Sequence, residues 1–444
     1  MKSTGSFSPF EISDRRLRSL GGTRPGPGEA AALDDWLHSR RLVLLKTLLT
    51  RAERARLPEA AARKLDAHWA LLEHAERRDP AAMRAVLGYP AVGNWLARAL
   101  EARTGDDFAA ALAGSGTLAA TVATVAGCDF RVELPVTGGH LVLPGLGAYA
   151  ATTPAVRLEA AGDTLTFTPD GGTPASLPRT AVLARRRYGT VPWHPLSALP
   201  GGAAVLDDRD PHLGAGTGPQ DPAGLRPATV AGSAEERRWR ELWSGALALL
   251  REVDAERAAE TAGLVRAVVP VRSRPEGSVS ATRLAAPWAV LTTRPRTGEE
   301  MAEVLVHEVQ HSKLAVLEGV APLSHAPADG ERAPLYRVAW RSDPRPLGAV
   351  VQGTYAHLAL ADLWDRLARR DGAGPAAREA ARRRSADFAT QVDHALFLLL
   401  GSGQLTREGT EFVEGMRRRH ARLTAPGGRD ARGATHNLTN RHFG

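Results

Sequence analysis

The residues best suited to chemistry are His307, Glu308 and His311, which form an H-E-x-x-H motif. Residues four apart lie on one face of an α-helix, so both histidines can direct a ring nitrogen at one metal ion. Glu308 directly follows the first histidine, where its carboxylate can reach a water molecule on that metal. The alternative is an ordinary surface helix with two unrelated histidines, because so short a motif also arises by chance.

The setting of the motif favours the metal site. Thr297 and Glu300 have the spacing of a capping box, which predicts the start of an apolar helix that contains the motif. The segment 286–293 before it is apolar and strand-like. Gln310 and Lys313 add polar atoms near the same helix face. We therefore expect a metal centre on this helix.

A tight catalytic site needs a third protein ligand. The metzincin pattern is excluded, because Leu314 and Leu317 stand where that class has Gly and His. Four side chains further along the chain could ligate a metal: Glu318, His325, Glu331 and His357. His325 and Glu331 lie in loop-like segments, whereas His357 lies in an apolar helix expected over 348–370. We predict that His357 is the third ligand; a buried core histidine is the alternative.

Arg345 stands between Pro344 and Pro346, which stiffen the backbone around it. One interpretation is a rigid turn in which Arg345 pairs with Asp343. The other is an arginine presented to a carboxylate of a small substrate, which a guanidinium binds through two parallel hydrogen bonds. The sequence leaves both interpretations open.

These motifs together resemble a bacterial family. The runs H-E-x-Q-H-S-K-L at 307–314, W-R-x-D-P-R-P at 340–346 and G-x-Y-A-H-L at 353–358 are similar to HExxH-motif proteins found with ribosomally synthesised, modified peptides. Such proteins occur alone or fused behind radical-SAM maturases. The resemblance spans most of the chain and is strongest over 286–370. One departure is Gln352, since a second histidine often stands at that position, and this puts a role for the side chain in doubt.

The resemblance implies a reaction and its cofactors. Members of the family are regarded as iron(II)- and 2-oxoglutarate-dependent peptide β-hydroxylases, which makes a ribosomally made precursor peptide the implied substrate and a radical-SAM maturase a candidate partner. The implied iron ligands are His307, His311 and His357. Glu308 would orient a ligand or a water molecule rather than act as the base of a hydrolysis.

The same resemblance implies a cation for the second co-substrate. 2-Oxoglutarate would chelate the metal through its keto-acid end, and its far carboxylate would need a fixed positive charge. Arg345 is the first choice for that charge, followed by Arg341 and Lys313.

Two other functions compete with the peptide hydroxylase. A zinc-dependent HExxH metallopeptidase uses the same motif, but the chain offers no convincing acidic third ligand. A protein that only binds a precursor peptide or a maturase is the non-enzyme alternative, and it lacks support because all the candidate ligands are intact.

Composition excludes several other classes. The chain has 444 residues, of which 43% are hydrophobic and 24% charged, so it can bury a large core. The net charge of +8 comes from arginines spread along the chain, which argues against a nucleic-acid site. Cys128 is the only cysteine, which excludes a disulfide framework and fits a reducing cytoplasm. The uncharged stretch 108–128 is too weakly apolar for a membrane span, and the first residues lack the apolar core of a signal peptide.

We expect an α+β protein in which the patterning changes along the chain. Leucines at helical spacing predict a helical region over 1–115, and short apolar runs between Gly, Pro and Asp predict a β-rich region with a connection over 116–232. Residues 233–424 form the expected HExxH catalytic region, with a flexible tail over 425–444. The acidic run at 207–212 could gather a cation, although turns of this kind are usually solvated.

Overall fold

The fold combines helices at both ends of the chain with a β-rich middle. The computed structural model is 57% helical and 16% strand, which confirms the α+β class. It describes residues 12–26, 28–55, 57–214, 225, 227–230, 232–272, 278–327 and 332–425. The expected tail therefore lies outside the described residues, apart from residue 425.

Two compact units make up the chain, and both are assembled from separate segments. The unit that we call the sheet unit contains residues 32–247 and 261–304, and the helical unit contains residues 1–31, 248–260 and 305–444. These units cut across the consecutive regions expected from the sequence. The H-E-x-x-H residues and all their predicted partners belong to the helical unit.

Helices begin the sheet unit: α2 (Glu29–Arg54), α3 (Glu59–Arg78), α4 (Pro80–Leu87), α5 (Pro90–Glu101), α6 (Gly105–Leu112) and α7 (Gly114–Val125). Their ends follow local chemistry. The Asp79 side chain accepts the backbone N–H groups of Ala81 and Ala82 at the start of α4, and Pro80 fills the first helical position. Thr104 caps α6 in the same way, by accepting from Asp107 N–H.

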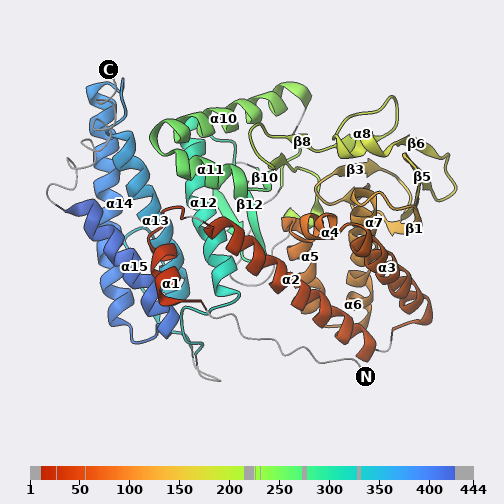
Figure 1. Cartoon of the computed structure of the whole chain (residues 1–444), viewed down its shortest axis with the longest axis horizontal. Coiled ribbons are helices and arrows are strands. Elements are labelled where there is room, and N and C mark those ends of the chain that lie inside the picture. The colour runs from red at the N-terminus through yellow and green to blue at the C-terminus, as the bar shows by residue number, and fades with distance from the viewer. Residues whose placement is uncertain are drawn as a thin grey trace, which may run out of the picture. The chain divides into compact units, whose positions relative to one another are not determined.

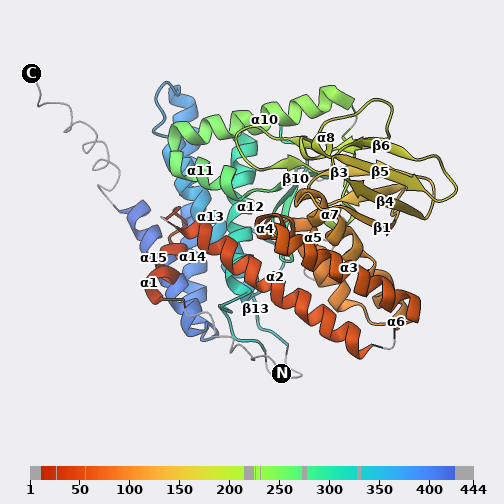
Figure 2. The same ribbon diagram turned by 45° about the vertical axis from the view of Figure 1, so that its right-hand side comes forward.

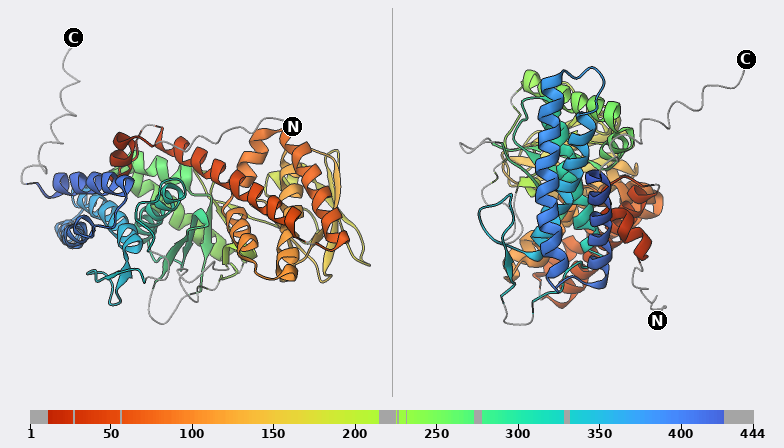
Figure 3. Two further views of the ribbon diagram at one scale, coloured as in Figure 1. Left: turned by 90° about the horizontal axis from the view of Figure 1, so that it is seen from below. Right: turned by 90° about the vertical axis from the view of Figure 1, so that its left-hand side faces the viewer.

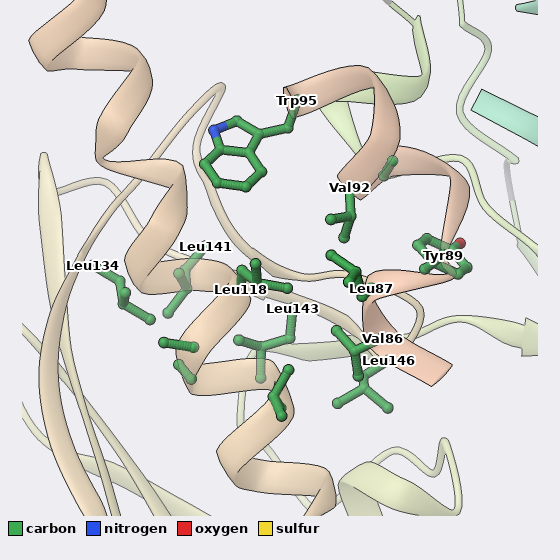
Figure 4. Close-up of a cluster of buried hydrophobic side chains, with 14 of the residues drawn as sticks. Val86, Leu87, Tyr89, Val92, Trp95, Leu118, Leu134, Leu141, Leu143 and Leu146 are labelled. Atoms are coloured by element: carbon green, nitrogen blue, oxygen red, sulfur yellow. The ribbon is translucent and has the colours of Figure 1, made fainter. Parts of the chain in front are cut away.

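Residues 105–125 are the stretch of the described chain long and apolar enough to cross a membrane. Of its most apolar window, 56% is buried inside the structure, as in the core helix of a soluble protein. Figure 4 shows Leu118 of α7 among Leu134, Leu141 and Leu143 from the neighbouring strands, where these side chains form part of the hydrophobic core. The small residues of α7 therefore serve close packing.

The middle of the sheet unit folds into three sheets. An antiparallel sheet has the order β1 (Phe130–Pro135), β4 (Ala155–Ala161), β5 (Thr164–Pro169), β6 (Ala175–Pro178), and its strands lie side by side in Figure 2. A second antiparallel sheet contains β2 (His140–Leu143), β3 (Gly147–Ala150) and β7 (Trp193–Pro195). Buried and exposed residues alternate along β4, as expected for a sheet with one face on the core. Two short helices belong to the same part of the chain: α8 (Arg179–Leu183), between β6 and β7, and α9 (Pro211–Gly214), further along.

The third sheet leads into the motif helix. Its order is β11 (Ser280–Arg283), β12 (Ala286–Thr292), β10 (Ala267–Pro270), β9 (Val205–Leu206), β8 (Ser197–Ala198), with β10 parallel to both β9 and β12. Every residue of β12 is buried, as is typical of an inner strand with both faces covered; β12 pairs with β10 in parallel and with β11 antiparallel. The chain leaves β12 and enters α12 (Gly298–Glu318) after a short connection. This confirms the strand and the helix expected around the motif.

The helical unit consists mainly of α1 (Asp14–Gly21), the second part of α12, α13 (Leu347–Leu367), α14 (Pro375–Gly401) and α15 (Arg407–Thr424). Helices α1, α13, α14 and α15 lie side by side in Figures 1 and 3. Helices α1 and α15 approach closely because Gly415 has no side chain; a Cβ there would collide with the Arg18 carbonyl oxygen. Helices α10 (Gly232–Val253) and α11 (Ala255–Leu264) connect segments of the two units, and β13 (Leu335–Tyr336) pairs with β14 (Arg345–Pro346).

A buried ionic network holds the helices of this unit together. The Asp362 carboxylate on α13 pairs with Arg257 of α11 at 3.3 Å, with Arg366 at 3.4 Å and with Arg419 of α15. Burial opposes the charge on Asp362, but the surrounding guanidinium groups outweigh it and lower the pKa of this carboxyl to about 2. The network fixes α13, which also carries His357 and Gln352.

Candidate metal centre

The helix that carries the motif starts where the sequence predicts. Thr297 Oγ1 accepts the backbone N–H of Glu300 at 3.1 Å. The Glu300 carboxylate turns back and accepts the backbone N–H of Arg296 at 2.8 Å, one residue before the position that a standard capping box uses. The cap fixes where α12 begins, and the four-residue spacing within the helix brings His307 and His311 onto one face.

His307 and His311 face each other through their Nε2 atoms, which are 2.9 Å apart. With a metal–nitrogen distance of about 2.1 Å, two nitrogen ligands at a right angle around one ion lie about 3.0 Å apart. Burial, and then the neighbouring His311, lower the pKa of His307 well below its ordinary value, so this ring is neutral at neutral pH. Neutral imidazole is the form that binds a metal, and the pair therefore fits a single ion.

Gln352 of α13 contacts this pair, although the sequence analysis left its role in doubt. Its Oε1 lies 2.8 Å from His311 Nδ1, and its Nε2 donates to Glu318 Oε2 at 3.3 Å. The hydrogen bond occupies the His311 nitrogen that faces away from His307. Glu318, one of the candidate third ligands, is thus engaged by the amide of Gln352.

His357 lies beside the pair, as expected for the third ligand. The three rings are near enough to share one ion, but they are not arranged around a common metal position. The ring centre of His357 is 6.0 Å from that of His307, and two histidines on one ion have ring centres at most about 6.5 Å apart. Burial, with the adjacent His307 and His311, lowers the pKa of His357 to about 3, and its Nδ1 is buried without a hydrogen-bond partner. Within the described ranges, no three His, Cys, Asp or Glu side chains are arranged to hold a metal ion. The third-ligand assignment therefore stays a prediction.

Aromatic side chains surround His357. Trp340 and Phe388 contact the ring edge-on, with ring centres 4.6 Å and 5.1 Å away. Trp340 reaches this place because Gly353 leaves room for it; a Cβ on Gly353 would lie 2.7 Å from the indole ring. The G-x-Y-A-H-L run thus supplies both His357 and the space for the tryptophan of the W-R-x-D-P-R-P run.

The other candidate ligands lie elsewhere. His325 is exposed, and its backbone N–H donates to the carbonyl oxygen of Gln404 at 2.9 Å. Glu331 lies outside the described residues. Glu308 is only 1% exposed, so its carboxylate is turned into the protein rather than into open solvent.

The predicted cations differ in how they are held. Arg345 Nη2 pairs with Asp343 Oδ2 at 2.7 Å, and Arg341 Nε pairs with the other oxygen of the same carboxylate at 3.0 Å. This is the pairing proposed for the rigid-turn interpretation. Arg345 keeps further N–H groups, and its Nε is buried without a hydrogen-bond partner. Both arginines therefore stay candidates for binding an anion.

Lys313, the third candidate cation, pairs with a different carboxylate from the two arginines. Its ammonium donates to Glu260 Oε1 at 2.7 Å, and both side chains are buried. Burial opposes the charge on Lys313, but the Glu260 carboxylate outweighs it and raises the pKa of the ammonium. The pairing argues for a structural role, because a lysine bound in this way has no free charge for 2-oxoglutarate.

The acidic run 207–212 forms a closed turn in the sheet unit. Asp207 Oδ1 accepts the backbone N–H groups of Arg209 and Asp210 at 3.1 Å and 3.0 Å, and its Oδ2 accepts the hydroxyl of Tyr89. Asp210 Oδ1 accepts the backbone N–H of His212 at 2.9 Å. These donors occupy both oxygens of Asp207 and one oxygen of Asp210.

Comparison with known proteins assigns neither a family nor a function to the chain. No protein-family model matches the chain, and no curated protein matches it. The function must therefore be argued from the site itself.

Proposed function

We propose that the chain is an iron(II)- and 2-oxoglutarate-dependent dioxygenase that hydroxylates the β-carbon of a residue in a ribosomally made precursor peptide, in the cytoplasm. The observation that carries the proposal is the pair of Nε2 atoms of His307 and His311, which lie 2.9 Å apart, with burial keeping the His307 ring neutral at neutral pH. No nucleic acid and no membrane is needed for this reaction, and a radical-SAM maturase is the proposed partner.

The residues of the helical unit have distinct roles in this proposal. His307 and His311 hold the metal, and His357 completes the set from α13. When bound, iron(II) and 2-oxoglutarate supply the electrons that reduce oxygen, with 2-oxoglutarate ending as succinate and carbon dioxide. Three neutral ligands leave the full charge of the ion available to the keto-acid. Glu308, buried next to His307, orients a ligand or a water molecule.

Trp340 and Phe388 contribute by excluding water. Both rings contact His357, and a site shielded from water strengthens the interactions inside it. Arg345 is the proposed partner of the far carboxylate of 2-oxoglutarate, with Arg341 next to it. Lys313 is the weakest of the three candidates, since it is paired with Glu260.

A zinc peptidase would use the same two histidines. The third ligand and the product distinguish such a peptidase from the proposed hydroxylase. Zinc peptidases of this type add an acidic ligand, but Glu318 accepts a hydrogen bond from Gln352. Zinc(II) has no accessible redox change and can only polarise a carbonyl or activate water. The two enzymes therefore differ in what they do to a peptide.

The experiment incubates the chain with its precursor peptide under two conditions. With iron(II), 2-oxoglutarate and oxygen, we expect the mass of the intact peptide to rise by one oxygen atom, with one succinate formed for each hydroxylation. A matched incubation with zinc and no oxygen should leave the peptide unchanged. Cleavage of the peptide with zinc in the absence of oxygen, together with no gain of oxygen in the iron reaction, would replace the hydroxylase by the peptidase.

A further inference from the structure

Gln352 occupies a position between two side chains of α12. Its amide oxygen lies 2.8 Å from His311 Nδ1 and its amide nitrogen 3.3 Å from Glu318 Oε2. His311 and Glu318 lie about two turns apart on α12, on the same side of the helix, and Gln352 reaches them from α13. We propose that Glu318 and Gln352 are positioning residues that hold His311 in the tautomer that leaves Nε2 free to bind a metal. This proposal rests on the metal site proposed above.

The direction of each hydrogen bond follows from the chemistry of the groups. An ionised carboxylate only accepts hydrogen bonds, so the NH₂ group of Gln352 must face Glu318. The amide oxygen of Gln352 then faces His311 and can only accept. His311 Nδ1 must therefore carry a proton. A flipped amide would instead place two acceptor oxygens against each other.

The consequence appears on the other side of the His311 ring. A neutral imidazole carries one proton, so a proton on Nδ1 leaves the lone pair of Nε2 bare. This Nε2 is the atom that lies 2.9 Å from His307 Nε2. Metal-binding histidines in general have the other ring nitrogen fixed by a hydrogen bond, which sets both the tautomer and the orientation of the ring.

The Gln352 amide stands between the Glu318 carboxylate and the His311 ring, with one hydrogen bond to each. Glu318 therefore acts on His311 through Gln352, and in our proposal it is not a metal ligand.

The first test uses metal-free protein, so it does not depend on the proposed reaction. Nitrogen-15 NMR of the histidine rings reports which nitrogen carries the proton. We expect the Nδ1–H form for His311 in the original chain and a loss of that preference in Gln352→Leu. Gln352→Glu retains an acceptor oxygen and should restore the Nδ1 proton. A His311 ring that stays in the Nδ1–H form in Gln352→Leu would overturn the proposal.

The second test measures the affinity for cobalt(II) alone, as a probe for the site. Loss of a residue that orients a ligand typically weakens metal binding about 10- to 100-fold, and we expect a loss of that size for Gln352→Leu. Glu318→Leu should also weaken binding, because the amide is then free to flip. Gln404→Leu, on neither α12 nor α13, is the matched control and should bind as the original chain does.

The outcomes separate the two proposals. An unchanged cobalt affinity in both Gln352→Leu and Glu318→Leu would overturn the positioning roles even if the chain proves to be a hydroxylase. Metal binding that weakens as expected, in a chain that never hydroxylates a peptide, would support the positioning roles and reject the proposed function.

Discussion

The histidine pair of α12 and the acidic turn at 207–212 both contain polar groups that are removed from water. The two clusters differ in the hydrogen-bond partners that these groups find inside the protein. In the turn, Asp207 accepts hydrogen bonds from the Tyr89 hydroxyl and from two backbone N–H groups. In the pair, the two Nε2 atoms face each other at 2.9 Å, and the outer nitrogen of His311 is held by Gln352. Protein donors occupy the oxygens of Asp207, whereas the two Nε2 atoms of the pair are close enough to share one metal ion.

Burial also shifts the pKa values in the two clusters in opposite directions, because in each case it favours the uncharged form of the group. It raises the pKa of Asp210 well above its ordinary value, and the nearby Asp207 charge adds to this. It lowers the pKa values of His307 and His357. A protonated carboxyl is a poor metal ligand, whereas a neutral imidazole is a good one. The same loss of water thus disfavours a cation in the turn and prepares the histidines to bind one.

The largest expected effect is the loss of metal from the histidine variants. His307→Ala, His311→Ala and His357→Ala should each weaken metal binding by more than the roughly 100-fold that marks the upper range for orienting residues, because each removes a ligand. Metal content after dialysis, read by elemental analysis, checks this. His325→Ala, in an exposed loop, and Asp207→Asn, in the acidic turn, should keep the metal. Full metal content in His357→Ala would remove the third-ligand assignment.

The next effect concerns the ion pair on the same helix. Lys313→Met leaves Glu260 as a buried, unpaired carboxylate, which typically costs about 3–5 kcal/mol of unfolding free energy. Denaturant unfolding measures the loss, and Glu260→Leu combined with Lys313→Met should recover most of it. A stable Lys313→Met variant with a raised requirement for 2-oxoglutarate would instead return Lys313 to the co-substrate site.

A smaller loss is expected from the acidic turn. Tyr89→Phe removes the hydroxyl that donates to Asp207 and leaves a buried oxygen with one partner fewer, which costs about 1–3 kcal/mol. The aromatic ring stays among the core residues in Figure 4, so the packing is preserved. Thermal and denaturant unfolding check the loss. Cobalt affinity should stay unchanged, and a fall in that affinity would show that the two clusters are not independent.

The last expected effect is a change in the pH dependence of stability. The raised pKa of Asp210 means that the folded chain holds a proton that the unfolded chain releases above about pH 4. The contribution of Asp210 to stability is therefore full in acid and is lost as the pH rises towards the folded-state pKa. Its greatest slope is about 1.4 kcal/mol per pH unit. Asp210→Asn keeps the oxygen that accepts from His212 and should remove this fall in stability above about pH 4. An identical pH profile in the variant would contradict the raised pKa.

Local patterns predicted the elements that carry the site. The Thr297 cap, the apolar strand before it and the four-residue spacing of the histidines each depend on neighbours in the chain, so α12 and the facing of its histidines could be expected. The α+β class followed from the same kind of pattern. These features need no knowledge of how distant segments meet.

The partners of the site could not be predicted in that way. Gln352 meets His311 across 41 residues of sequence, and Lys313 meets Glu260 across 53. Both contacts depend on where other helices lie against α12, and no spacing in the sequence encodes this. From sequence alone, Lys313 was therefore a candidate cation for 2-oxoglutarate, and Gln352 had no assigned role.

The binding of 2-oxoglutarate to the chain tests the central claim most directly, because it needs no knowledge of the peptide. The measurement is an equilibrium titration without oxygen, with and without iron(II). We predict that one 2-oxoglutarate binds per chain only when iron(II) is present, that His311→Ala abolishes this binding, and that Arg345→Lys weakens it because lysine cannot form two parallel hydrogen bonds. Binding of 2-oxoglutarate that is absent with iron(II), or that is the same without the metal, would contradict the account.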